Sequence, residues 1–167
     1  RVAMVMDLLQ GVDGESFVDS SNLYIHFIDA VAAVHREAKF ILGVRNGKDF
    51  VRSAFSRGWH ERNSFGIMPL PEDPFFGKWA EMTPLQKNAW IWVSRNEKAL
   101  RALNEVSADR KLVVRIEDIE KEGTLDLLES FSGIGIDRKA AKKRHNANPR
   151  QGLPPKEQWS RQMVREF

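Results

Sequence analysis

The chain of 167 residues is 42% hydrophobic and 10% aromatic, which excludes a disordered tail and indicates a single domain over residues 1–167. It has no cysteine and four histidines without metal-ligand spacing, so neither a disulfide nor a metal site is predicted. The absence of a long apolar run and of a signal-peptide pattern predicts a cytoplasmic protein with no membrane span.

The net charge of +3 hides an asymmetry along the chain. Residues 137–165 carry nine Lys and Arg against two acidic residues, and the remainder is slightly acidic. A basic segment on a weakly acidic body typically faces a polyanion, which could be nucleic acid, anionic lipid or a polyphosphorylated nucleotide. The alternative is a helix face that is only solvated.

The first part of the chain predicts two strands among helices. Residues 1–10 have the apolar density of a helix, and residues 16–21 predict a short buried strand running into a polar turn. Asn22 can cap the following helix, whose apolar residues recur at helical spacing. Residues 39–45 form an apolar run of strand length, which we expect at the centre of a sheet.

The middle of the chain predicts two helices separated by a long loop. Residues 48–57 are predicted to be helical, and Gly58 closes that helix. Residues 59–82 are rich in Pro, Gly and aromatic residues, which indicates a binding loop or lid. Thr83 and Pro84 then open a long amphipathic helix.

The last part predicts a second central strand at residues 111–115 and helices at 124–132 and 137–146. A loop follows, and a final amphipathic segment lies around Trp159. Strands that alternate with helices, each strand too apolar to face water, predict an α/β fold with a parallel sheet and helices on both faces.

Candidate binding residues follow the two apolar strands. In open α/β sheets, ligands bind beyond the carboxyl ends of the strands. Arg45 ends the first strand, and the turn and helix N-terminus after it would complete a phosphate site from a guanidinium, backbone N–H groups and the helix dipole. Ser53 could reach the same anion if its helix packs back along the strand. Arg115 ends the second strand.

Residues 45–53 (RNGKDFVRS) closely resemble the 3′-phosphate-binding motif of the sulfotransferases that use 3′-phosphoadenosine 5′-phosphosulfate (PAPS), in which a strand ends in R-N-x-K-D-x-x-x-S. Residues 17–21 (FVDSS) look like the strand end that carries acceptor-side groups in that family. Residues 113–119 (VVRIEDI) are similar to its V-x-Y-E-D-L strand end, and residues 131–136 (FSGIGI) to its F-L-G-L segment. The resemblance covers residues 15–165 in the order of the family.

The resemblance implies a three-layer, P-loop-like α/β fold with a central parallel sheet flanked by helices. It implies that Arg45 and Ser53 hold the 3′-phosphate of PAPS. Arg150 and Gly152 are similar to the R-K-G element that closes over the same phosphate, and Arg115 would lie on the cofactor side. A role in binding PAPS would also explain the basic C-terminal region.

Two departures from the family pattern stand out. Residues 1–14 lack the Gly-rich, Lys-Ser/Thr character of the family's phosphosulfate loop, so we expect the chain to lack that loop and to be part of a longer protein. Ile116 stands where the family often has a Tyr that stacks on adenine. The base would then be held by Arg115 or by a tryptophan of the long loop.

The resemblance also implies a general base, a His or a carboxylate, near the family's second strand, which the predicted strand over residues 16–21 resembles. Asp19 and Glu15 are the candidates because no His occupies that stretch, and His60 and Glu61 are second choices. Asp19 could equally cap the helix that begins at Asn22, so both interpretations stay open. Glu117 and Asp118 are interpreted as a cap of the following helix.

The leading prediction is a PAPS-dependent sulfotransferase that acts on a hydroxyl or amine of a small molecule or glycan, without metal, nucleic acid or membrane partners. The aromatic loop favours an apolar or ring-bearing acceptor. One alternative is a nucleotide-dependent kinase of related architecture, although no G-x-x-x-x-G-K-[ST] is present. Another is a nucleic-acid-binding domain, although the basic region lacks interleaved aromatic residues.

Overall fold

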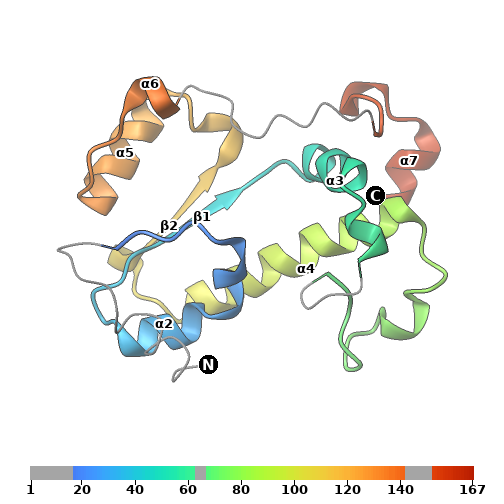
Figure 1. Cartoon of the computed structure of the whole chain (residues 1–167), viewed down its shortest axis with the longest axis horizontal. Helices are drawn as coiled ribbons and strands as arrows, with labels where there is room; N and C mark the ends of the chain where they lie inside the picture. Colours follow the sequence, from blue (N-terminus) through green and yellow to red (C-terminus); the bar gives the residue numbers. More distant parts are fainter. Residues whose placement is uncertain (1–16, 63–66, 142–151) are drawn as a thin grey trace. The chain divides into compact units, whose positions relative to one another are not determined.

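The computed structural model describes residues 17–62, 67–141 and 152–167 (Figure 1). The predicted helix over residues 1–10 lies outside these ranges. None of the described helices is long and apolar enough to cross a membrane.

The α-helices and strands are, in chain order, α2 (Ile28–Val34), β1 (Phe40–Val44), α3 (Gly47–Ser56), α4 (Pro84–Asn104), β2 (Lys111–Arg115), α5 (Glu122–Ser132), α6 (Arg138–Ala141) and α7 (Arg161–Glu166). Short 3₁₀ helices are η1 (Asn22–His26), η2 (Trp59–Glu61), η3 (Phe76–Lys78), η4 (Ala108–Arg110), η5 (Ile116–Asp118) and η6 (Lys156–Gln158).

The described residues fall into two compact units. The first contains residues 17–43 together with Asn96–Val114. The second contains the described residues of Val44–Arg95 and Arg115–Phe167. Helix α4 runs from the second unit into the first.

β1 and β2 pair as a parallel two-stranded sheet, which confirms both predicted strands and a mixed helix-and-strand fold. The described residues do not show the finer expectation that both strands are central and covered by helices on both faces. Among these residues β1 and β2 pair only with each other, and Ile41 and Val113 are 45% and 49% exposed. Apolar character predicted the strands correctly, but it did not determine what covers them.

The predicted strand over residues 16–21 is wrong in its described part. Residues 17–21 form neither helix nor strand, and Val18 is 70% exposed. The polar side chains turn the backbone instead, because Asp19 Oδ1 accepts a hydrogen bond from the Ser21 backbone N–H at 2.6 Å. The helix predicted to start at Asn22 begins as η1 and becomes α-helical in α2.

The core of the first unit lies between α2 and the C-terminal part of α4. Ile28 of α2 packs with Ala99 and Leu103 of α4, and all three are buried. Phe40 and Leu42 of β1 pack against the same cluster. The apolar periodicity of the α2 sequence therefore identified the face that is buried.

The core of the second unit lies between α3 and the N-terminal part of α4. Val51 of α3 is fully buried against Leu85 and Ala89 of α4 and against Trp159. The predicted start of α4 is confirmed. Thr83 and Gln86 form a reciprocal capping box, in which the Gln86 N–H donates to Thr83 Oγ1 and the Thr83 N–H donates to Gln86 Oε1.

The described parts of the loop over residues 59–82 contain η2 and η3. Gly58 has φ of 64°, a left-handed conformation that ends α3 as predicted. Ile67 and Trp79 of the loop are buried on Ile91 of α4. This part of the loop is therefore packed onto α4.

Candidate functional site

The turn after β1 is built around Asn46, whose side chain caps α3. Its Oδ1 accepts hydrogen bonds from the backbone N–H groups of Lys48 (3.1 Å) and Asp49 (3.4 Å). The indole Nε1 of Trp92 donates to the carbonyl of Arg45 at 3.0 Å. The backbone of Arg45 is thus held by α4, while its side chain is exposed.

Glu117 ties the end of β2 to the turn after β1. Its Oε1 accepts a hydrogen bond from the Asn46 backbone N–H at 2.6 Å. Arg115 lies beside it, with Nε 4.0 Å from Glu117 Oε2. The structure therefore brings the backbone N–H of Asn46 and the side chain of Arg115, a predicted binding residue, to one carboxylate.

The prediction that Glu117 and Asp118 cap the following helix is wrong. The N-cap of α5 is Lys121, without a side-chain cap. Asp118 instead pairs with the Lys121 ammonium at 2.8 Å, which lowers the pKa of the Asp118 carboxyl. Sequence reasoning missed the cross-strand role of Glu117 because its partner lies 71 positions away.

One face of α3 contacts a distant part of the chain. We call it the Ser53 face, and its members share helical spacing: Asp49, Arg52, Ser53 and Ser56. Residues 152–156 lie against this face through three contacts. Gly152 is so close to Ser56 that a Cβ added to the glycine would meet the Ser56 Cβ at 3.0 Å.

The other two contacts are polar. Arg52 Nε donates to the carbonyl of Leu153 at 3.4 Å, and Lys156 Nζ donates to Asp49 Oδ2 at 2.6 Å. The hydrogen bond to Asp49 raises the pKa of Lys156 above its ordinary value. The segment thus runs antiparallel to α3, with Gly152 near the end of the helix and Lys156 near its first turn.

The structure places Gly152, the described residue of the C-terminal R-x-G element, beside the motif helix. Gly152 contacts α3 three residues after Ser53, on the face that Ser53 shares. Arg150, the other predicted member of this element, lies outside the described residues. The contact between Gly152 and Ser56 could not have been predicted from spacing alone, although the resemblance did assign Gly152 to the phosphate of Ser53.

Two polar groups at this site are available to a ligand. Within the described ranges, no carboxylate pairs with the Arg45 guanidinium, and no hydrogen-bond partner meets the Ser53 hydroxyl. Arg52 differs, because it lies 3.6 Å from Asp49 and bonds to Leu153. An oxyanion is the kind of group that a guanidinium and a hydroxyl bind together.

Asp19 belongs to the first unit, where its carboxylate is held by neighbours. Besides the Ser21 N–H, it accepts a hydrogen bond from the Tyr24 hydroxyl. Burial first, and then the negative charge and hydrogen bond of Asp19, raise the pKa of Tyr24. Asp19 therefore makes a local turn. Its Oδ1 accepts from the N–H of Ser21, which precedes η1, so a cap of the helix that begins at Asn22 is not shown. Glu15 lies outside the described residues.

His60 and Glu61, the second choices for the base, lie in η2. The fully buried side chain of Asn88 donates from Nδ2 to the Pro84 carbonyl (2.8 Å) and to His60 Nδ1 (3.2 Å). Because Nδ1 accepts, the proton of a neutral His60 ring lies on Nε2, which is 3.6 Å from Glu61. Both ring nitrogens thus have structural neighbours, which favours a packing role for His60.

Comparison of the chain with protein-family models, curated proteins and solved structures found no match. The function is therefore argued from the residues and their contacts. Among the described residues, no three His, Asp or Glu side chains are grouped as metal ligands.

Proposed function

We propose that the protein is a PAPS-dependent sulfotransferase, which transfers the sulfuryl group of PAPS to an acceptor hydroxyl or amine. The observation that carries this proposal is the packing of residues 152–156 along the Ser53 face of α3. It brings two sequence elements about a hundred positions apart to one helix, and the family resemblance assigns both to the same phosphate. If the likeness to the family in these two short motifs arose by chance, there would be no reason for residues 152–156 to lie against α3.

The residues present fit the 3′-phosphate of PAPS. The Arg45 guanidinium and the Ser53 hydroxyl, which have no partner among the described residues, would hold it. Asn46 fixes the start of α3, so the positive end of the helix dipole lies beside Arg45. Arg115 adds a second, largely exposed guanidinium near the same turn, for the cofactor side.

The fold that goes with this activity is a three-layer, P-loop-like arrangement around a central parallel sheet. The parallel pairing of β1 and β2 supports it, because parallel strands normally belong to sheets whose two faces are covered by helices. We propose that β1 and β2 belong to such a sheet.

When bound, PAPS supplies the sulfuryl group: the acceptor oxygen or nitrogen bonds to sulfur, the bond from sulfur to the 5′-phosphate oxygen breaks, and 3′-phosphoadenosine 5′-phosphate leaves with the electron pair. The protein positions the nucleotide through Arg45 and Ser53. Asp19 takes the proton of the acceptor, and the hydrogen bond from Tyr24 orients its carboxylate. Little covalent work falls to the protein in such a transfer.

A calorimetric titration with four ligands tests the proposal: 3′-phosphoadenosine 5′-phosphate, adenosine 5′-phosphosulfate, ATP and a single-stranded oligonucleotide. We expect the 3′-phosphorylated nucleotide to bind at least about tenfold more tightly than adenosine 5′-phosphosulfate, because a charge-assisted hydrogen bond contributes roughly 1.5–3 kcal/mol. Tightest binding of ATP would favour a kinase. Tightest binding of the oligonucleotide would favour a nucleic-acid-binding domain, and either result would overturn the proposal.

A further inference from the structure

The peptide unit between Arg45 and Asn46 is held by hydrogen bonds at both of its polar groups. Its carbonyl oxygen accepts from the indole Nε1 of Trp92 at 3.0 Å, and its N–H donates to Oε1 of Glu117 at 2.6 Å. Trp92 lies on α4, and Glu117 lies in η5, directly after β2. Two elements that are far apart in the sequence therefore fix the plane of one peptide.

The plane of this peptide determines how the side chain of Arg45 leaves the backbone. The C=O and N–H of a trans peptide turn together as one rigid unit, so the two hydrogen bonds set the ψ angle of Arg45. On the other side, Arg45 directly follows β1, which pairs with β2. The backbone is thus held before and after Arg45, while its guanidinium is exposed. The direction of this side chain therefore depends on Trp92 and Glu117.

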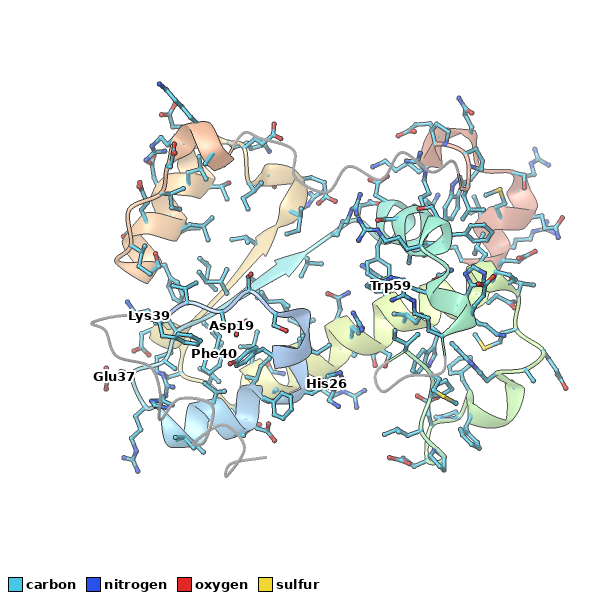
Figure 2. The ribbon with its side chains drawn as sticks, in the orientation of Figure 1. Asp19, His26, Glu37, Lys39, Phe40 and Trp59 are labelled. Atoms are coloured by element: carbon cyan, nitrogen blue, oxygen red, sulfur yellow. The ribbon has the colours of Figure 1, made fainter. Side chains whose placement is uncertain are left out.

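Trp92 is held in place by the packing of α4 on α3. Trp59 of η2 joins the two helices (Figure 2). Its ring packs edge-to-face on Phe50 of α3, with centroids 5.6 Å apart, and the guanidinium of Arg95 of α4 lies 5.0 Å from its centroid. The indole of Trp92 also lies so close to Gly47 that a Cβ added to the glycine would meet it at 3.3 Å. The indole N–H therefore comes from a packed side chain.

Three backbone N–H groups at this turn donate to side chains of the protein itself. Glu117 accepts from the Asn46 N–H, and Asn46 Oδ1 accepts from the N–H groups of Lys48 and Asp49. A phosphate at the start of α3 would have to displace these oxygens in order to use the same N–H groups. The exposed guanidinium of Arg45 can donate to a phosphate without breaking any of these bonds. Its orientation therefore matters for binding.

We propose that Trp92 and Glu117 are positioning residues, which hold the peptide after Arg45 so that the Arg45 guanidinium meets the 3′-phosphate of the nucleotide. This inference rests on the proposed function, because it takes Arg45 as the group that binds that phosphate. Neither Trp92 nor Glu117 needs to touch the nucleotide, since both act through Arg45. The preference for a 3′-phosphorylated nucleotide should therefore depend on them only while Arg45 is present.

The test is the ratio of the calorimetric affinities for 3′-phosphoadenosine 5′-phosphate and adenosine 5′-phosphate, which differ only in the 3′-phosphate. Trp92→Phe removes the indole N–H and keeps an aromatic ring, and Glu117→Ala removes the carboxylate. We expect each variant to lower the ratio by roughly three- to tenfold, the factor that corresponds to one net hydrogen bond.

Two matched variants serve as controls for this ratio. Trp90 stands two positions from Trp92 on α4 and packs edge-to-face on Trp79, so Trp90→Phe should keep the wild-type ratio. In Glu117→Gln, the amide oxygen can still accept from the Asn46 N–H, so this variant should keep most of the ratio that Glu117→Ala loses.

A double-mutant cycle separates positioning from a general loss of structure. In the Arg45→Ala background, Trp92→Phe and Glu117→Ala should leave the ratio unchanged, because the group that they orient is gone. Side chains that act independently of Arg45 would lower the ratio by the same factor in both backgrounds, and that result would overturn the inference. So would a wild-type ratio in both Trp92→Phe and Glu117→Ala.

The hydrogen bonds to the peptide can also be tested without nucleotide. Loss of the indole N–H frees the peptide to turn, so hydrogen exchange at the Asn46 amide should be roughly threefold or more faster in Trp92→Phe and unchanged in Trp90→Phe. Unchanged exchange in Trp92→Phe would overturn the inference. A wild-type protein that does not distinguish the two nucleotides would instead contradict the proposed function itself, whatever the variants do.

Discussion

The ammonium of Lys156 lies 2.6 Å from the carboxylate of Asp49, although 107 positions separate the two residues in the sequence. Asp49 lies in the first turn of α3, one residue after Lys48, within the motif of residues 45–53 that we propose to bind the 3′-phosphate. The pair therefore fixes Lys156, at one end of the segment 152–156, to the first turn of α3, which follows Arg45. It is a connection between the motif helix and the basic C-terminal region.

Removing the charge of Lys156 should loosen this segment. In Lys156→Met, we expect amide hydrogen exchange of residues 152–158 to be roughly two- to fivefold faster, the range that a partly exposed ion pair would give. Lys139→Met, which removes an exposed lysine of α6, should leave that exchange unchanged. Equal exchange in both variants would mean that the ion pair does not hold the segment.

The same pair predicts a dependence on alkaline pH. The bond to Asp49 raises the pKa of Lys156 above its ordinary value of 10.5. A raised pKa in the folded state means that the contribution to stability is fully present below 10.5 and is lost as pH rises through the higher, folded-state value. In a ¹³C-lysine NMR titration, Lys156 should therefore lose its proton above pH 10.5. Titration of Lys156 at or below 10.5 would contradict the contact.

Gly152 leaves little room for a side chain. An added Cβ would lie 3.0 Å from the Ser56 Cβ and 3.3 Å from its backbone nitrogen, so Gly152→Ala must displace the segment from α3 by a few tenths of an ångström. We expect calorimetry to show roughly two- to fivefold weaker binding of 3′-phosphoadenosine 5′-phosphate, because even small misplacement of binding groups weakens binding. Gly77→Ala is the control, since a Cβ there would meet nothing within 4 Å. Similar affinities for both variants would separate Gly152 from nucleotide binding.

Asp19→Asn distinguishes the two roles of Asp19. An Asn side chain keeps the oxygen that accepts from the Ser21 N–H, so the turn should remain intact. If Asp19 takes the acceptor proton, sulfuryl transfer to an acceptor hydroxyl should slow by about 10²–10⁴ while nucleotide affinity stays nearly constant. Asp109→Asn, at an exposed carboxylate of the same unit, is the control. Wild-type turnover in Asp19→Asn would leave Asp19 as a residue of the turn alone.

The sequence predicted local elements better than the contacts between them. Strands at residues 39–45 and 111–115, the Thr83 cap and the turn at Gly58 all follow from periodicity and residue type, and each is confirmed. The strand over residues 16–21 failed because an Asx turn at Asp19 competes with extended structure. The pattern of apolar and polar residues that predicted the strand does not reveal the competing turn at Asp19.

In the candidate site, too, the residues of a local motif could be predicted from the sequence, whereas contacts between distant residues could not. Arg45 and Ser53 could be chosen because one short motif contains both. Glu117 and Lys156 could not, because their partners Asn46 and Asp49 lie 71 and 107 positions away. Hydrogen bonds over such distances depend on the packing of the helices, which no local pattern encodes.

The sulfotransferase proposal depends most directly on Arg45, whose guanidinium is exposed at the start of α3. The decisive measurement is the affinity of Arg45→Ala for 3′-phosphoadenosine 5′-phosphate and for adenosine 5′-phosphosulfate, with Arg101→Ala as the control for loss of one exposed positive charge. We predict that Arg45→Ala weakens the 3′-phosphorylated nucleotide by at least about tenfold, hardly changes adenosine 5′-phosphosulfate, and differs in this from Arg101→Ala. Equal losses for the two nucleotides, or no loss for either, would contradict the assignment of Arg45 to a 3′-phosphate.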